Sequence, residues 1–412
     1  MKCRHCASPL HLDFIDLGFA PPSNAYLGLD DLSRPELYYP LRVKVCESCW
    51  LVQTEDFAQR DAFFNADYAY FSSVSSSWLA HAQHYVAMIT ARLGLTSASM
   101  VWEVAANDGY LLQYVAARGI PCLGIEPTHG TAEAARAKGL TVEEVFFGQQ
   151  SAAALRNHYG LADLIVANNV LAHVPDINDF VAGLATGLAQ GGTITLEFPH
   201  LLALIIHSQF DTIYHEHYSY LSLLAVQRIL AAAGLRIYDV ERLSTHGGSL
   251  RVYACHQQAK QASSAAVLNL IDEEISAGLN QAHVYRQFQQ QAITVRLALT
   301  AFLLEQHRAG KRVLAYGAAA KGNTLLNYAG IDAVLLPMVA DAAPSKQGKY
   351  LPGSHIPILT PTELIQARPD YVLILPWNLK AEVMQELAVI AEWGGQFVTA
   401  VPKLQIIKST VR

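Results

Sequence analysis

The fold class is easiest to recognise at residues 101–109, which read Val101-Trp102-Glu103-Val104-Ala105-Ala106-Asn107-Asp108-Gly109. The first four residues are typical of a buried strand, and the small and polar residues after them predict a tight turn into a helix. In an open parallel sheet, ligands bind beside such turns, at the carboxyl ends of the strands. The Gly-x-Gly-x-x-Gly pattern that cradles the pyrophosphate of a dinucleotide is absent.

Short apolar segments alternate with helical patterns on both sides of this turn. Further strands are predicted at 122–125, 164–166 and 193–196, with helices at 75–93, 111–118 and 132–138. This alternation predicts an α/β domain with a doubly wound parallel sheet. Two strands, at 236–240 and 250–254, then follow each other without a helix between them. Such a pair is expected where the sheet ends with an antiparallel strand, as in class I methyltransferases.

Regions on both sides of this unit complete a three-domain organisation. The first 70 residues are irregular and aromatic apart from a strand at 41–45, so we expect a small module at 1–70. The sheet-forming domain is expected at 71–256, and a helical connector at 257–306 opens a second Rossmann-like α/β domain, expected at 257–412. Strands of this last domain are predicted at 312–316, near 334–335 and at 371–375.

Composition limits the kinds of protein to which the chain can belong. Its 412 residues suggest two to four domains, and 52% of them are hydrophobic, which predicts packed domains rather than disorder. The formal net charge is −6 and no basic run occurs, so we expect no nucleic-acid partner. No apolar run is long enough to cross a membrane, and the first residues lack the apolar region of a signal peptide. We therefore expect a cytoplasmic protein without a membrane partner, while the oligomeric state stays open.

Four of the six cysteines form two close pairs, Cys3 with Cys6 and Cys46 with Cys49. In a reducing compartment such pairs hold metal more often than they form disulfides. Two Cys-x-x-Cys turns supply the four thiolates of a tetrahedral zinc site, and a site filled by protein ligands is structural. We expect structural Zn²⁺ there, and we expect Cys122 and Cys255 to be inert core residues.

The turn after the first strand is suited to a cationic cofactor. Glu103 and Asp108 bring negative charge, and the small residues Ala105 and Ala106 let a ligand approach the backbone. Asn107 and Gly109 of the same turn are also expected to contact the cofactor. S-adenosylmethionine carries a sulfonium and an ammonium group and no phosphate, so it tolerates these acids better than a dinucleotide would. Glu126, which ends the second strand, is placed to accept hydrogen bonds from both ribose hydroxyls. The spacing alone fits either adenosine cofactor.

Two polar clusters follow the fourth and fifth predicted strands. They are Asn168-Asn169-Val170-Leu171-Ala172-His173-Val174-Pro175 and Phe210-Asp211-Thr212-Ile213-Tyr214-His215-Glu216-His217-Tyr218. Histidine titrates near neutral pH, so both clusters suit proton transfer, and Asn168 and Asn169 lie where the strands converge on the cofactor. The His-Glu-His run could also bind a metal, because His215 and His217 would share one side of an extended segment. No third ligand is evident, so we expect acid–base chemistry.

These motifs together resemble those of the three-domain deoxysugar C-methyltransferases, which act on nucleotide-linked 4-keto sugars. The resemblance extends over essentially the whole chain, and the Tyr-His-Glu-His run and a lysine loop near the C-terminal domain's first strand are its most specific parts. Beyond the paired cysteines and the turn after the first strand, the matching segments are 16–24, 168–173, 211–217, 245–249 and 317–323.

The resemblance implies methylation, with S-adenosylmethionine as methyl donor, of the carbon (C-3) beside the ketone of a dTDP-type sugar. A base removes the proton from this carbon, and the enolate attacks the sulfonium methyl. We expect His217 to be the base and Tyr214 and His173 to donate hydrogen bonds to the enolate oxygen. The other residues expected at this end of the substrate are Glu216, His246, and Tyr68 or Tyr70, which would close the site.

The last domain is expected to bind the nucleotide end of the substrate. Its glycine-containing loop precedes a helix that we expect to begin near Leu325, and backbone N–H groups at a helix N-terminus favour anions. The loop is not a Walker A motif. A lysine in it adds a point charge suited to a diphosphate. The residues expected to contact the substrate are Lys321, Gly322, Asn323, Asp341 and Lys346.

Three other functions remain open at this point. A sugar O-methyltransferase of the same fold would need a base near a hydroxyl and no ketone. A nicotinamide-dependent oxidoreductase could use either Rossmann-like domain, although the glycine fingerprint is missing. A zinc-ribbon scaffold without activity would have no use for the histidines, tyrosines and glutamate at the strand ends.

Overall fold

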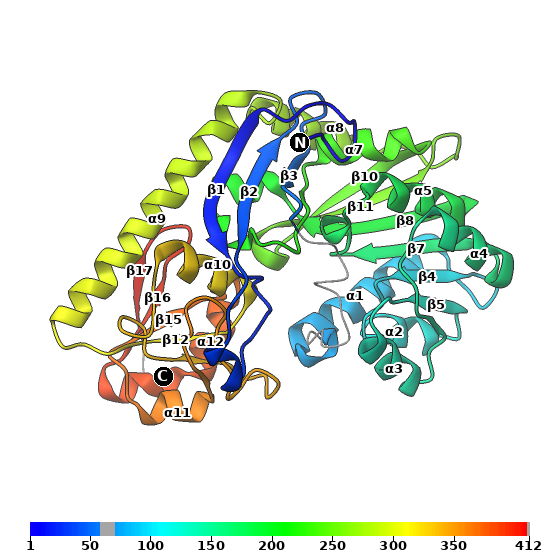
Figure 1. The fold of residues 1–412 in the computed structure, drawn as a ribbon. Helices are drawn as coiled ribbons and strands as arrows, with labels where there is room; N and C mark the ends of the chain where they lie inside the picture. The colour runs from blue at the N-terminus through cyan, green and yellow to red at the C-terminus, as the bar shows by residue number, and fades with distance from the viewer. Residues whose placement is uncertain (58–70, 410–412) are drawn as a thin grey trace.

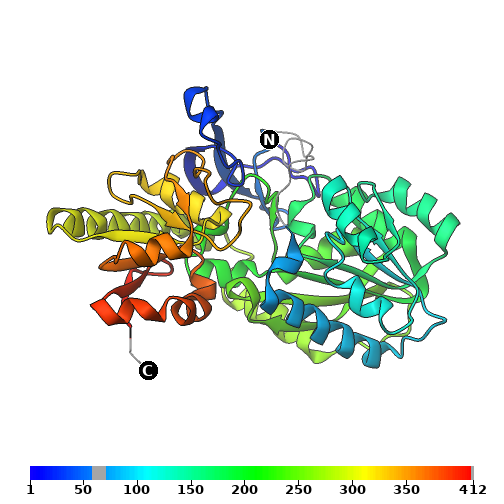
Figure 2. The ribbon, with the colours of Figure 1, turned by 90° about the horizontal axis from the view of Figure 1, so that it is seen from below.

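A computed structural model describes residues 1–57 and 71–409 (Figure 1). Three sheets of four, seven and six strands make up the fold. The N-terminal sheet lies between the larger seven-stranded sheet and the C-terminal sheet, as two perpendicular views agree (Figures 1 and 2). In the part of the chain that is described, no helix is both long and apolar enough to cross a membrane.

The seven-stranded sheet has the order β10-β11-β8-β7-β4-β5-β6. Its strands are β4 (Val101–Val104), β5 (Cys122–Ile125), β6 (Val142–Glu143), β7 (Ala162–Asn168), β8 (Leu188–Pro199), β10 (Leu235–Leu243) and β11 (Ser249–His256). β4 to β8 run parallel, whereas β11 is antiparallel to both β8 and β10. This is the strand order of a class I methyltransferase, so the predicted fold class is confirmed. The β4 strand lies inside the sheet, paired with β5 and β7, and all four of its residues are buried.

Helices cover both faces of this sheet, as the alternating pattern predicts (Figure 1). They are α1 (Ser76–Leu93), α2 (Leu112–Ala116), α3 (His129–Ala137), α4 (Gln149–Tyr159), α5 (Ile177–Gly187), α6 (Leu201–Ile206) and α7 (Leu223–Ala232). Apolar side chains at helical spacing bury one face of each longer helix, such as Tyr85, Val86 and Ile89 of α1.

The N-terminal sheet is antiparallel and has the order β1-β2-β3-β9. Its strands are β1 (Leu12–Ala20), β2 (Tyr39–Val45), β3 (Val52–Thr54) and β9 (Ser219–Tyr220). The expectation that residues before 41 are irregular was wrong for β1, whose apolar residues do not alternate strictly because two register shifts interrupt its pairing with β2. The β9 strand comes from the middle of the chain and pairs with β3 at Val52 and Gln53.

The C-terminal sheet has the order β14-β13-β12-β15-β16-β17. Its strands are β12 (Val313–Tyr316), β13 (Val339–Ala340), β14 (Ile358–Leu359), β15 (Tyr371–Ile374), β16 (Gln396–Thr399) and β17 (Gln405–Lys408). The helices after the seven-stranded sheet are α8 (Ala265–Ser276), α9 (Ala282–Arg308), α10 (Ala320–Ala329), α11 (Pro361–Gln366) and α12 (Lys380–Glu386). Phe14 of β1 stacks on Phe288 of α9, with ring centroids 4.4 Å apart, so the long connecting helix also covers the N-terminal sheet.

Two expectations for this region were wrong. The strand expected near residues 334–335 is a turn: Asp332 accepts a hydrogen bond from the amide of Val334, whose side chain is 66% exposed. The helix α10 begins at Ala320 rather than near Leu325, which places Lys321, Gly322 and Asn323 in its first turn. Glycine is required in this turn, since a Cβ on Gly322 would lie 2.9 Å from the Leu375 side chain.

Candidate active site

The four paired cysteines come together as predicted. Their sulfur atoms lie within 4.8 Å of one another, with 3.5 Å between Cys3 and Cys49 and 3.4 Å between Cys6 and Cys46. Two similar turns present them, because Ala7 donates its amide to the Cys3 carbonyl and Trp50 donates its amide to the Cys46 carbonyl. Four thiolates around one point are the ligand set of structural zinc, whose Zn–S bonds of about 2.3 Å fit this spacing. These turns are called the zinc knuckles below.

The turn after β4 adopts an unusual backbone conformation. Ala105, Asn107 and Gly109 all have positive φ, of 58°, 50° and 75°. A Cβ on Gly109 would lie 2.3 Å from a methyl group of Leu140, so this position requires glycine. The turn is anchored at the neighbouring strand, since Ala105 donates its amide to the carbonyl of Ile125. A ligand can therefore approach a fixed backbone at the carboxyl ends of β4 and β5.

Three carboxyl groups lie around this turn. Glu103 is buried, and burial raises its pKa well above the ordinary value. Glu126 accepts hydrogen bonds from the amides of Asn107 and Thr128 at 2.9 and 3.0 Å, and burial raises its pKa as well. Asp108 lies 3.3 Å from the ammonium of Lys138, which partly compensates its charge. A carboxylate has about four lone-pair sites, so Glu126 can accept hydrogen bonds beyond these two backbone contacts, as ribose hydroxyls would need.

The predicted asparagines end the neighbouring strand β7. Asn168 is its last residue, and its Oδ1 is buried without a hydrogen-bond partner among the described residues. Asn169 has a positive φ of 53° and donates its amide to the Glu197 carbonyl. Since β7 pairs with β4, both residues lie at the same edge of the sheet as the cofactor turn.

Two predicted histidines lie against each other beyond this edge. The rings of His173 and His217 are 4.6 Å apart between centroids, and the ring of Tyr214 lies 3.9 Å from that of His217. The Nδ1 of His217 donates to the Thr212 carbonyl at 2.8 Å, and the Nδ1 of His173 donates to the Glu216 carbonyl at 2.9 Å. A carbonyl only accepts, so both rings carry their proton on Nδ1 and leave Nε2 as an acceptor.

Burial keeps these two rings neutral. It lowers the pKa of His173 to about 4, and burial together with the nearby His173 lowers the pKa of His217 well below its ordinary value. A neutral imidazole whose Nε2 lone pair is available can accept a proton over the whole physiological pH range.

Glu216 is held by the N-terminal module. The Nδ2 of Asn24 lies 3.1 Å from both carboxylate oxygens, and burial raises the pKa of Glu216 to about 7. The neighbouring His215 does not share a side with His217, because residues 214–217 form a turn rather than an extended segment. His215 instead hydrogen-bonds the Tyr39 carbonyl at 3.3 Å. Among the described residues, the only group of side chains with metal-binding geometry is the cysteine cluster.

The C-terminal domain contributes a lysine and a tryptophan to the same region. The Nζ of Lys321 donates to Asn378 at 2.7 Å and lies 4.7 Å above the ring of Trp377. The indole N–H of Trp377 donates to buried Asp211 at 2.7 Å, and burial, opposed by the Lys321 charge, raises the pKa of Asp211 to about 6. The Lys321 charge also contributes to the lowered pKa of His217, after burial and the nearby His173.

The remaining predicted substrate residues have the following places. The amide Nδ2 of Asn323 donates to the Ser23 carbonyl at 2.6 Å, which joins α10 to the N-terminal module. Asp341 accepts a hydrogen bond from the Ala318 amide, and Lys346 donates to the Ala318 carbonyl, 3.5 Å from the Asp341 carboxylate. His246 has a positive φ of 54°, and burial lowers its pKa to about 4. Tyr68 and Tyr70 lie outside the described residues.

Sequence reasoning missed Asn24, Trp377 and Asn378 as parts of this region, and it placed Asp211 in the second polar cluster without a role of its own. Trp377 and Asn378 follow β15 just as the predicted histidine clusters follow β7 and β8, so the rule of looking after strand ends could have found them. Asn24 carries no such signal, because it reaches Glu216 only after the N-terminal module docks.

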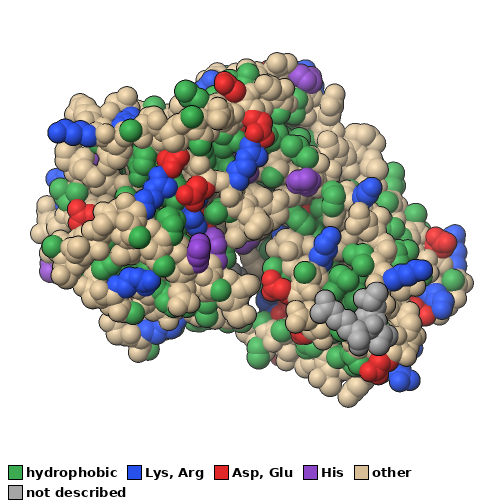
Figure 3. Space-filling view, turned by 180° about the vertical axis from the view of Figure 1, so that it is seen from behind, with side chains coloured by type: hydrophobic (Ala, Val, Ile, Leu, Met, Phe, Trp, Pro, Cys, Tyr) green, Lys and Arg blue, Asp and Glu red, His purple; other side chains and the backbone are tan. Residues whose placement is uncertain are grey.

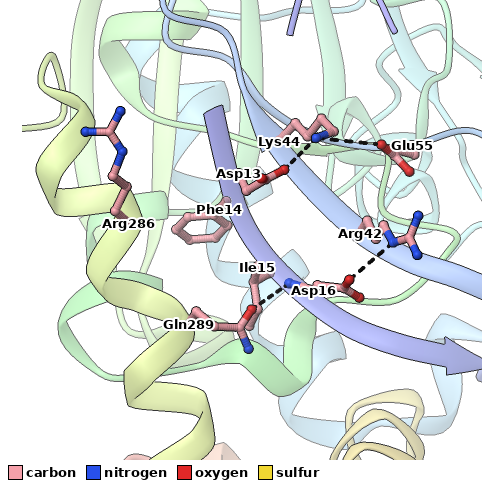
Figure 4. Close-up of a pocket in the computed structure, with 9 residues that line it drawn as sticks. All are labelled: Asp13, Phe14, Ile15, Asp16, Arg42, Lys44, Glu55, Arg286 and Gln289. Atoms are coloured by element: carbon pink, nitrogen blue, oxygen red, sulfur yellow. Dashed lines mark hydrogen bonds and ion pairs between the residues drawn. The ribbon is translucent and has the colours of Figure 1, made fainter. Parts of the chain in front are cut away.

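Two surface features lie apart from these residues. A pocket of about 490 Å³ opens between β1, β2 and α9, where Lys44 pairs with Asp13 and Arg42 pairs with Asp16, while Arg286 points away from these pairs (Figure 4). From behind, the molecule is hollowed between its two lobes, and charged side chains of both signs are interspersed over that face (Figure 3).

Comparisons with known proteins match all three parts of the chain. A family model described as a C-methyltransferase C-terminal domain matches residues 244–402, a zinc binding domain matches 3–64 and a methyltransferase domain matches 78–240. The C-methyltransferase NovU of Streptomyces niveus is 33% identical over 408 residues, which cover 99% of this chain and 97% of the relative.

Solved structures are similar over part of the chain. Magnesium protoporphyrin IX methyltransferase of Synechocystis PCC 6803, with bound SAH, is 18% identical, with a TM-score of 0.35 over 43% of this chain and 83% of the other. A S-adenosylmethionine-dependent methyltransferase of Clostridium acetobutylicum is 12% identical, with a TM-score of 0.35 over 42% and 90%. The full-length match and the three family models are what decide the assignment: the chain belongs to the family of S-adenosylmethionine-dependent C-methyltransferases that combine a zinc-binding domain, a methyltransferase domain and a C-terminal C-methyltransferase domain.

Proposed function

We propose that the chain methylates the carbon beside the ketone of a nucleotide-linked 4-keto deoxysugar, through an enolate. The observation that carries the proposal is the state of His217, whose Nδ1 proton is committed to the Thr212 carbonyl and whose Nε2 is therefore a base. A C–H bond beside a carbonyl is acidic enough for an imidazole to break, whereas an isolated C–H bond is not. Family membership requires a carbon nucleophile, and this geometry supplies a way to make one.

In the proposed reaction, His217 takes the proton from the sugar carbon onto Nε2. The electron pair of that C–H bond becomes the enolate, whose carbon then forms the new bond to the methyl group. S-adenosylmethionine, held by the cofactor turn with Glu103, Asn107 and Glu126, would supply this methyl. The bond between the methyl carbon and the sulfonium sulfur would break, its electron pair would stay on sulfur, and S-adenosylhomocysteine would leave. Substrate diphosphate brings negative charge, which would raise the pKa of His217 in the complex and strengthen it as a base.

In this proposal, Tyr214 stabilises the enolate oxygen by donating a hydrogen bond to it. The Nε2 of His173 is an acceptor in the structure, since its Nδ1 donates to the Glu216 carbonyl. His173 therefore packs against the base and keeps water from it, rather than donating a hydrogen bond to the oxygen. Lys321, whose ammonium lies above Trp377, adds positive charge on the substrate side. We further propose that Asp341 and Lys346 bind the nucleotide end.

The test is proton exchange on a keto sugar. The protein, loaded with S-adenosylhomocysteine, is incubated in D₂O with a thymidine-diphosphate-linked 4-keto-6-deoxy sugar, and NMR follows deuterium entry at the carbon beside the ketone. We expect exchange in the wild type, loss of exchange in His217→Asn, and a C-methyl product once S-adenosylmethionine is added. A methyl ether product without exchange would reject the proposal.

A further inference from the structure

Arg4 lies inside the first zinc knuckle, between the ligands Cys3 and Cys6. The side chain is only 5% exposed. Its Nη1 donates to the Pro175 carbonyl at 2.8 Å, and its Nη2 donates to the Thr54 carbonyl at 3.1 Å. The guanidinium carbon lies 5.3 Å from the centre of the Tyr218 ring. One side chain thus contacts three segments that are far apart in the sequence.

Two of these segments carry the predicted catalytic histidines. Pro175 ends the cluster that contains His173, and Tyr218 directly follows His217. Thr54 completes the connection, because its Oγ1 donates to the His217 carbonyl at 3.2 Å and its amide donates to the Tyr218 carbonyl at 3.1 Å. The guanidinium therefore holds the loop of His173 directly and the loop of His217 through Thr54 and Tyr218.

The two loops are also bonded to each other. The amide of Tyr218 donates to the Ala172 carbonyl at 2.8 Å, and the imidazole of His173 donates to the Glu216 carbonyl at 2.9 Å. These bonds set the distance between the rings of His173 and His217. Little regular secondary structure holds the two loops, because His173 ends a 3-10 helix of only three residues, Leu171–His173, and residues 213–218 belong to no helix or strand. A planar guanidinium with a fixed fork can bridge two carbonyls in a single geometry, which a flexible ammonium cannot.

We propose that Arg4 is a positioning residue, through which the zinc knuckle keeps the loops of His173 and His217 in register for proton removal. The proposal rests on the function proposed above for its catalytic consequence, though not for its structural one. Zinc bound to Cys3 and Cys6 would fix the backbone on both sides of Arg4, and Arg4 would transmit that rigidity to the loops. A displacement of about 1 Å of a catalytic group can cost about 10²-fold in rate, so a modest loosening is enough to matter.

The test compares Arg4→Ala and Arg4→Lys with Arg228→Ala. Arg228 is a matched control. Its Nη1 donates to the Ser48 carbonyl of the second zinc knuckle at 2.9 Å, and among the described residues it has no hydrogen bond or ion pair with either histidine loop. Each variant is purified with zinc, its metal content is measured, and amide hydrogen exchange is followed by mass spectrometry in residues 170–175 and 214–218. The affinity for S-adenosylhomocysteine, and kcat and KM on the keto sugar, are measured on the same samples.

We expect both Arg4 variants to keep zinc and cofactor affinity, to exchange faster in both segments, and to lose about 10- to 100-fold in kcat with little change in KM. Arg228→Ala should match the wild type in every readout. Faster exchange in only one segment, or unchanged exchange and kcat in zinc-loaded Arg4→Lys, would overturn the proposal. If the wild type fails to methylate the keto sugar, the proposed function is wrong, whereas the exchange measurements still decide the role of Arg4.

Discussion

Replacing His217 by asparagine should remove the proposed base and keep its hydrogen bond to the Thr212 carbonyl. The amide nitrogen of asparagine comes close to the Nδ1 position, so it can still donate to the Thr212 carbonyl that His217 contacts at 2.8 Å. The variant loses the ring contacts with Tyr214 and His173, which are worth about 0.5–1.5 kcal/mol each beyond their buried area. We therefore expect a folded protein that is less stable by about 1–3 kcal/mol.

The effect on chemistry should be much larger. A positioned base contributes about 10²–10⁴ in rate, which corresponds to about 2.7–5.4 kcal/mol of barrier. We expect kcat and deuterium exchange to fall together by that factor, while S-adenosylhomocysteine binds as before. His215→Asn is the matched control. It removes the neighbouring ring, whose Nε2 hydrogen-bonds the Tyr39 carbonyl of the N-terminal sheet, and it should leave kcat within about threefold. A His217→Asn variant that exchanges and turns over within tenfold of the wild type would refute the assignment.

Three further predictions concern the cofactor turn, a buried histidine and the domain interface. Gly109→Ala should weaken S-adenosylhomocysteine binding in calorimetry and destabilise the fold by about 1–3 kcal/mol, because φ is +75° and a Cβ would lie 2.3 Å from a leucine methyl. Gly94→Ala is the control: its φ is +64°, no atom lies near the added Cβ, and binding should be unchanged. The pKa of His173 is about 4 when folded against 6.5 ordinarily, so as pH falls from 6.5 to 4 the unfolded chain takes up a proton that the folded protein does not. Between pH 6.5 and 4, His173 should therefore lower the free energy of unfolding of the wild type by about 1.4 kcal/mol per pH unit, and His173→Asn should lack this decrease. Urea unfolding at several pH values measures it, and the same dependence on pH in both proteins would contradict the prediction. Trp377→Phe removes the indole N–H that donates to Asp211 at 2.7 Å, and it should lower the stability by about 1–3 kcal/mol. It should also raise the KM for the sugar substrate without changing the affinity for the cofactor. An unchanged KM would show that Trp377 is not part of the substrate site.

The central fold could be predicted because its signals are local. Buried strands such as β4 are short, mostly apolar segments, and no α-helix lies between β10 and β11, so both features were recognised from residue pattern alone. The β1 strand was missed because its bulges disrupt the alternation of buried side chains. The β9 strand has only two residues, and its partner lies more than 160 positions earlier in the chain, which no local pattern reveals.

The parts of the site that could be predicted are likewise those that lie in short local motifs. The cysteine pairs and the cofactor turn are motifs within a few residues, and the metal cluster was confirmed. The domain boundaries and the roles of the individual site residues stay predictions. Asn24 and Trp377 escaped because each meets the histidine region only through docking of a separate domain. Membership in the C-methyltransferase family also excludes the oxidoreductase and scaffold alternatives and disfavours O-methylation.

The donated strand β9 has a consequence for how the protein is made. The N-terminal sheet lacks its fourth strand until residues 219–220 have left the ribosome, so β3 presents unpaired N–H and C=O groups while most of the methyltransferase domain is synthesised. A nascent chain stalled before that point exposes β3 as an unpaired edge strand, which can pair with a second copy of the chain. An exchange of the N-terminal module between related enzymes should accordingly succeed only if β9 is exchanged together with it.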